Sequence, residues 1–160
     1  MLVLFLKFLH VAAAIWFISG LLGRTITNWQ ASKAADVKTV ATLMRLSSYF
    51  EMWMVRPGSV IVLGFGLVTA WLGRWQLLGS TPSCWLLLST VIYLSAVPII
   101  PLVFIPRGKV FASALEQSLS LGQVTPALRA AFADRAVRMG HIYEFAVILV
   151  VTLLMVVKPF

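Results

Sequence analysis

The chain is poor in cysteine, in histidine and in charged residues, and acidic residues are the scarcest charged class. Its 160 residues include one cysteine, two histidines and five aspartate or glutamate residues. The single cysteine, Cys84, excludes an intramolecular disulfide and any cysteine-rich metal cluster. Only 11% of the residues are charged, whereas 61% are hydrophobic and the mean hydropathy is +0.97. This composition is typical of a chain that lies mostly within lipid.

The sequence lacks the motifs of several classes of enzymes and binding proteins. No phosphate-binding loop, nucleophile triad, zinc motif or calcium loop is present. The net charge is +8, but the basic residues sit at the ends of apolar runs and form no patch with interleaved aromatic residues. The positive-inside rule explains them better than nucleic-acid binding does, so we expect the lipid bilayer as a partner and no nucleic acid.

Four apolar segments are long enough to cross a hydrocarbon core of ~30 Å. They are about Leu2–Gly23, Met54–Gly73, Cys84–Ile105 and Met139–Val157. Most of the basic residues lie in or beside the first and third links, which places these links in the cytoplasm and both termini outside. The sequence therefore predicts an all-α fold with one domain over residues 1–160, a four-helix transmembrane bundle in the inner membrane of a bacterium.

Prolines mark irregular points in the second and third helices. The second helix is expected to begin near Asp36 and to bend at Pro57, which lacks a backbone donor. Pro98 and Pro101 lie three residues apart in the third span and should open that helix. Irregular backbone of this kind is tolerated in a membrane only where protein or a cavity covers it.

The third link is expected to hold a short interfacial helix. This helix would cover Lys109–Leu121 and end at Gly122. Its membrane-facing residues would be Val110, Phe111, Ala114 and Leu115. Thr125 and Pro126 have the residue types of an N-cap and a first helical position. From there one helix is expected to run unbroken to Val157.

His10 is the residue around which we build the candidate site. It lies near the middle of the first span, where an ionisable side chain is costly and by default marks a function. At 3.6 residues per turn it shares a stripe with Lys7, Ala14 and Arg24, and such a face should point into the bundle. Two interpretations remain open: a neutral histidine hydrogen-bonded to a neighbouring helix, or an axial ligand to a haem iron.

A second polar group lies on the last helix. Arg138, His141 and Glu144 follow one another at a spacing of three and share one face. Glu144 should be protonated, paired or hydrated, and its candidate partners are cytoplasmic arginines. They are Arg24, Arg56, Arg107 and Arg138. A structural ion pair, a proton relay with His141 and Glu144 as catalytic residues, and an anion site all remain open.

The predicted depths of the two histidines argue against one haem held by both. His10 lies ~13 Å inside the outer end of its helix, whereas His141 lies two residues from the inner end of its span. Their heights then differ by roughly 14 Å, too far for two nitrogens on one iron. At the height of His10 we expect Gly66, which would leave space for a porphyrin, and Tyr93 and Thr152, either of which would satisfy a structural histidine.

Both terminal helices resemble a known enzyme family. The opening FLHVAAAIWFISGLLGR is similar to the first helix of HemJ-type protoporphyrinogen oxidases, with His10, Trp16–Phe17, Gly20 and Arg24 at the matching positions. The ending resembles that family's last helix, with a glutamate near its start and a closing Lys-Pro. The overall layout is closer still to a related family of small bacterial membrane proteins of unknown function.

The resemblance implies that His10 binds haem b, with Glu144 as a second functional candidate. The first histidine of HemJ-type proteins is a presumed haem ligand. Protoporphyrinogen oxidation is implied less strongly, because the second and third spans contain no lysine and Tyr143 precedes Glu144 where that family has an asparagine.

Three functions follow as expectations. The first is a b-type haem protein that transfers electrons or oxidises a hydrophobic substrate, with haem iron on His10 and with Arg24, Gly66 and Tyr93 around the cofactor. The second is a non-catalytic subunit that assembles with other membrane subunits or with further copies of the chain. The third and weakest is a carrier, suggested by the prolines of the third span.

Overall fold

The computed structural model describes residues 1–75, 77 and 83–158, and within these ranges all regular structure is helical. Four helical stretches are long and apolar enough to cross a membrane, which confirms the predicted all-α class with four apolar helices. These stretches are Leu2–Lys33, Val37–Leu72, Cys84–Leu121 and Pro126–Val157. The chain divides into two compact units, Met1–Trp75 and Gln76–Phe160.

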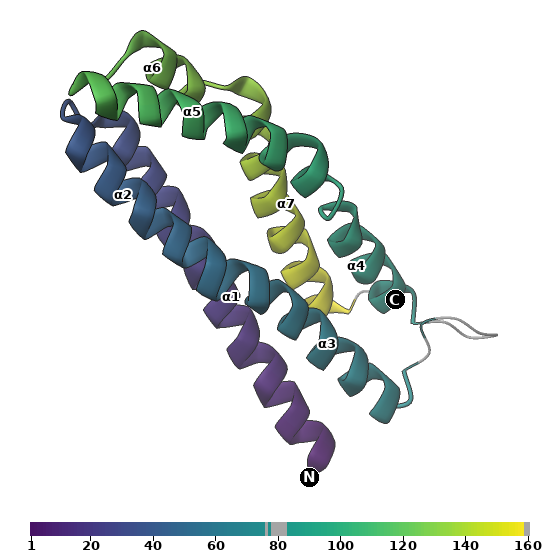
Figure 1. The fold of residues 1–160 in the computed structure, drawn as a ribbon. Helices are drawn as coiled ribbons and strands as arrows, with labels where there is room; N and C mark the ends of the chain where they lie inside the picture. Colours follow the sequence, from purple (N-terminus) through teal and green to yellow (C-terminus); the bar gives the residue numbers. More distant parts are fainter. Residues whose placement is uncertain (76, 78–82, 159–160) are drawn as a thin grey trace. The chain divides into compact units, whose positions relative to one another are not determined.

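The first unit is a hairpin of two long helices. Its elements are α1 (Leu2–Lys33), α2 (Val37–Phe50), a π-helical turn η1 (Glu51–Val55) and α3 (Arg56–Leu72). Figure 1 shows α1 lying beside both α2 and α3. At 1.5 Å per residue the 32 residues of α1 reach about 48 Å, which exceeds a ~30 Å hydrocarbon core. The polar end of the hairpin near Lys33 therefore extends beyond that core.

The return helix begins where the sequence predicts. Asp36 is the N-cap of α2, and its carboxylate accepts a hydrogen bond of 2.9 Å from the backbone N–H of Thr39. This bond, with a second one from the Thr39 hydroxyl, lowers the pKa of Asp36. Just before Pro57, where a bend was predicted, the structure has the π-helical turn η1, in which the N–H of Arg56 donates to the carbonyl of Glu51.

Two glycines allow the helices of the hairpin to touch. A Cβ on Gly20 of α1 would lie 2.5 Å from Cβ of Met54, and a Cβ on Gly58 of α3 would lie 3.0 Å from Cβ of Phe17. A side chain at either position would collide with the opposite helix. Small residues permit such close approach between helices in lipid, where van der Waals packing replaces the hydrophobic driving force.

The second unit contains α4 (Cys84–Ser95), the π-helical turn η2 (Ile100–Phe104), α5 (Ile105–Leu121), α6 (Pro126–Phe132) and α7 (Arg135–Val157). In this unit α7 packs beside α4, and α6 folds back on α5 (Figure 1). The α-helix stops at Ser95, before Pro98, and resumes at Ile105. The predicted opening of the third helix at its prolines is confirmed.

The third link differs from the prediction in its length and its contacts. Its helix begins at Ile105 and has 17 residues. Phe111, which was expected against the membrane, packs edge to face on Phe132 of α6 at a centroid distance of 4.9 Å. Gly122, with φ of 67°, ends α5, and Thr125 caps α6 through a hydrogen bond from the N–H of Leu128. Both end signals in the sequence are confirmed.

The prediction of one unbroken helix from Pro126 to Val157 is wrong. α6 ends at Phe132 and α7 begins at Arg135, with Asp134 between them. The Asp134 carboxylate accepts hydrogen bonds from the backbone N–H groups of Ala136 and Val137 at 2.8 and 3.2 Å. An aspartate that bonds nearby backbone donors in this way starts a new helix and competes with continuation of the old one.

Candidate functional site

The histidine of α1 is held by the backbone of α3. Nδ1 of His10 lies 2.9 Å from the carbonyl oxygen of Val62, and the side chain is half-buried. A carbonyl can only accept a hydrogen bond, so Nδ1 must carry the hydrogen. The neutral imidazole then has its lone pair on Nε2, to which no residue in the described part of the chain is hydrogen-bonded. The ring is therefore fixed in one tautomer and one orientation.

The partner of His10 differs from the two that the sequence suggested. Tyr93 or Thr152 was expected to satisfy a structural His10, but the carbonyl of Val62 does so. The expectation considered only polar side chains at the same depth. A helix carbonyl has two lone pairs and can accept a second hydrogen bond beside its helical one.

Gly66 provides the space in which the imidazole lies. It follows Val62 by one helical turn, and a Cβ built on it would lie 3.1 Å from Cε1 and 3.3 Å from Nδ1 of His10. The sequence suggested that Gly66 leaves room for a porphyrin. In the structure the ring of His10 uses that room, so Gly66 supports the histidine.

We predict that Gly66→Ala displaces the His10 ring and weakens its bond to Val62. The added methyl group requires a shift of a few tenths of an ångström in a packed contact, and such overpacking costs about 1–3 kcal/mol. Gly64→Ala is the matched control, because a Cβ there meets nothing within 4 Å. Thermal unfolding in detergent should show a lower transition temperature for Gly66→Ala only. Equal transition temperatures for the two variants would contradict a close contact between Gly66 and the ring of His10.

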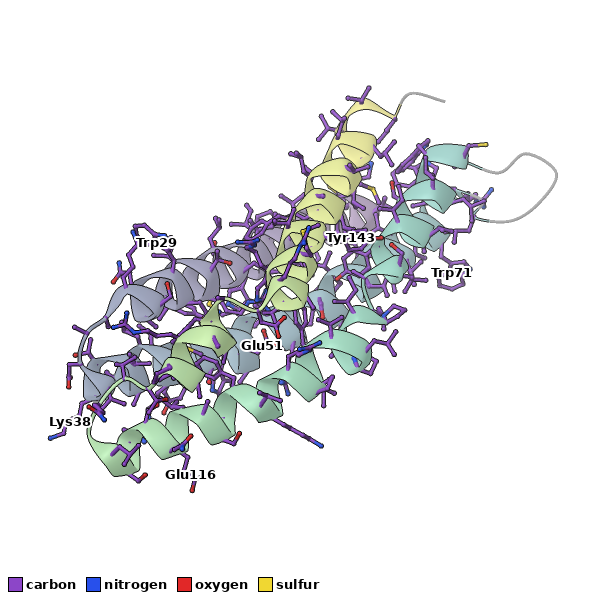
Figure 2. The ribbon with its side chains drawn as sticks, turned by 90° about the horizontal axis from the view of Figure 1, so that it is seen from above. Trp29, Lys38, Glu51, Trp71, Glu116 and Tyr143 are labelled. Carbon is purple, nitrogen blue, oxygen red and sulfur yellow. The ribbon has the colours of Figure 1, made fainter. Side chains whose placement is uncertain are left out.

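A charged cluster joins α1 to the π-helical turn of the same unit. Nη1 of Arg24 lies 2.7 Å from Oε2 of Glu51, and Nε of Arg56 lies 3.2 Å from Oε1. Arg24 is only 6% exposed, whereas the side chain of Arg56 is 64% exposed. Figure 2 labels Glu51. Sequence analysis missed Glu51 because it lies just before the predicted second span, although the scarcity of acidic residues was a usable signal.

The pair on the last helix forms as its spacing suggests. Nδ1 of His141 lies 3.1 Å from Oε2 of Glu144, and the side chains are 26% and 15% exposed. The ring of His141 stacks on Phe104 of η2 at a centroid distance of 4.8 Å. The neighbouring Tyr143, labelled in Figure 2, shares a 2.7 Å hydrogen bond with Ser95 of α4.

Three of the four arginines proposed as partners of Glu144 form ion pairs within their own units. Arg24 and Arg56 pair with Glu51, and Arg107 pairs with Asp134 at 2.9 Å. The contact found for Glu144 is with His141 on its own helix.

Three of the predicted cofactor residues belong to the first unit, and Tyr93 belongs to the second. His10 and Gly66 are in contact. Arg24 lies fourteen residues further along α1, about 21 Å at 1.5 Å per residue. Tyr93 is a half-buried residue of α4 in the second unit.

Long apolar helices, close contacts through glycine and buried polar pairs define the class of protein. The chain is a multi-pass integral membrane protein. It belongs to the family described as predicted integral membrane protein (DUF2269), whose model matches residues 4–159. No curated protein and no solved structure matches the chain.

Proposed function

We propose that the protein is a b-type haem protein of the bacterial inner membrane, with Nε2 of His10 as an axial ligand of the iron. The hydrogen bond from Nδ1 of His10 to the carbonyl of Val62 carries this proposal. A metal-ligating histidine almost always donates its other N–H to a carbonyl, a carboxylate or water, which fixes the tautomer and orients the ring.

The surroundings of His10 fit an iron that arrives within a porphyrin. The described residues contain no group of three or more histidine, cysteine, aspartate or glutamate side chains able to hold a metal. One imidazole cannot retain a bare ion, whereas a porphyrin supplies four nitrogens of its own. Gly66 leaves space for the ring of His10 against α3, and the small side chains of Ala13 and Ala14 limit crowding on the same helix.

The bound haem would supply one-electron redox chemistry. His10 would hold and orient it, and the apolar helices would exclude water. Lys7 lies one turn from His10 on the same face, with its ammonium 4.8 Å from the centroid of the Trp75 ring, and it is the nearest cation on that helix to neutralise a propionate. Arg24, which is paired with Glu51, would contribute positive electrostatic potential at the predicted cytoplasmic end of α1.

The resemblance of the first helix to HemJ-type oxidases supports an oxidoreductase or electron-transfer role. His10, Gly20 and Arg24 carry that resemblance. In this proposal His141 and Glu144 exchange protons at the predicted cytoplasmic side, where the pair is only partly exposed.

The test is the absorption spectrum of the protein purified from cells supplied with haem precursors. We expect a Soret band and, after reduction, the α-band of haem b, with about one haem per chain by the pyridine haemochromogen assay. A preparation without a Soret band, even after haemin is added, would contradict the proposal.

A non-catalytic subunit of a larger membrane assembly is the second candidate. Large aromatic side chains favour it, since Trp29 and Trp71 point outward in Figure 2 and are 58% and 77% exposed. Purification in a mild detergent separates the two proposals. Co-purifying membrane subunits without haem support the second, and a stable lone monomer with a Soret band rejects it.

A further inference from the structure

A pocket of about 500 Å³ lies in the second unit where α5 meets the start of α7. It is lined by Arg107, Asp134, Arg135, Ala136 and Met139. We propose that this pocket binds the phosphate headgroup of an anionic phospholipid. The proposal does not depend on haem binding.

The pocket offers more positive than negative charge to a ligand. Arg107 donates one hydrogen bond of 2.9 Å to Asp134 and keeps further donors of its five. The guanidinium group of Arg135 makes no hydrogen bond or ion pair with any residue that the structure describes. Guanidinium groups are well suited to phosphate because their donors are fixed in a planar fork.

The one carboxylate of the pocket is already satisfied. Oδ1 of Asp134 accepts the N–H groups of Ala136 and Val137, and Oδ2 accepts from Arg107. These bonds lower the pKa of Asp134, the bond from Val137 most of all. Its charge is thus compensated within the protein, and Arg135 remains to attract an anion. The positive end of α7, a helix of 23 residues, adds to this attraction.

The position of the pocket selects a lipid over a free phosphate. Arg107 lies two residues beyond the predicted third span and Met139 begins the predicted fourth span, which places the arginines at headgroup level in that prediction. Met139 is 54% exposed and lies one turn beyond Arg135, on the side of the span. A phospholipid would place its phosphate at the arginines and its chain along Met139. Basic pockets on the cytoplasmic side of membrane helices are known sites for anionic headgroups.

Native mass spectrometry of the full chain in detergent tests the proposal. The wild type is titrated with phosphatidylglycerol, with phosphatidylcholine of the same chains, and with inorganic phosphate as a competitor. We expect a preference for phosphatidylglycerol that millimolar phosphate does not remove. Arg135→Gln should weaken this binding about fivefold, from roughly 1 kcal/mol per basic residue near anionic lipid.

Arg129→Gln is the matched control, since it removes the same charge from an exposed position on α6 outside the pocket. It should bind phosphatidylglycerol like the wild type. Equal weakening of phosphatidylglycerol binding by both substitutions would show that only the net charge of the protein matters, and it would overturn the proposal. Equal binding of the two lipids would overturn it too, and full displacement by phosphate would replace the lipid with a free anion.

Discussion

His10→Ala is expected to abolish the Soret band of the purified protein. The substitution removes Nε2, the proposed ligand, and the Nδ1–H that bonds the carbonyl of Val62. A haem without its axial nitrogen loses its anchor, so occupancy should fall at least tenfold. The measurement is the ratio of Soret to protein absorbance, together with haem content by the pyridine haemochromogen assay.

Two further variants separate ligation from folding. His10→Gln retains an amide that can donate to Val62 but offers no imidazole nitrogen, so it should remain folded and lose haem. His141→Ala removes the other histidine, which pairs with Glu144 in the second unit, and should retain the Soret band. Unchanged haem content in both His10 variants would show that the cofactor is held elsewhere.

Glu51→Gln is expected to lower the stability of the first unit. It would remove a carboxylate charge that lies 2.7 Å from Nη1 of Arg24, a residue that is only 6% exposed. Removing one member of a buried ion pair costs about 3–5 kcal/mol, and partial exposure of Glu51 brings our expectation to roughly 2–4 kcal/mol. Unfolding in mixed micelles of increasing denaturing detergent, followed by circular dichroism, measures the change.

The control for this experiment is Glu116→Gln on α5, an exposed carboxylate, which should change stability by less than about 0.5 kcal/mol. The double substitution Arg24→Met with Glu51→Leu should recover much of the loss, because an apolar pair of similar volume often replaces a buried ion pair without cost. A Glu51→Gln variant as stable as Glu116→Gln would show that Arg24 does not depend on this carboxylate.

Much of the fold follows from patterns that physical chemistry makes explicit. Long apolar runs fix the four helices, and Asp36, Gly122 and Thr125 mark helix ends because their side chains or backbone freedom suit those positions. The break at Asp134 was missed because the apolar pattern continues across it. The available signal was the aspartate itself, because an aspartate side chain can accept hydrogen bonds from the first backbone N–H groups of a helix, as Asp134 does here.

The candidate site was only partly predictable. An ionisable residue inside an apolar run identified His10, and helical spacing identified the contact between His141 and Glu144. The partner of His10 could not be found in this way, because every residue of the opposite helix has a carbonyl and only the register of α1 against α3 selects Val62. The same register decides that Arg24 meets Glu51.

The π-helical turn η1 allows α1 to contact two different residues on the opposite helices, Glu51 and Val62. A π-helical turn holds one residue more than an α-helical turn, and in an α-helix one residue corresponds to a rotation of about 100°. The faces of α2 and α3 are therefore offset from the angle that a continuous α-helix would give them. Glu51, where this turn begins, and Val62, beyond it, can thus both reach α1. The extra residue of η1 thus sets how far the contact face of α3, in the apolar part of the hairpin, is rotated from the contact face of α2, at its polar end.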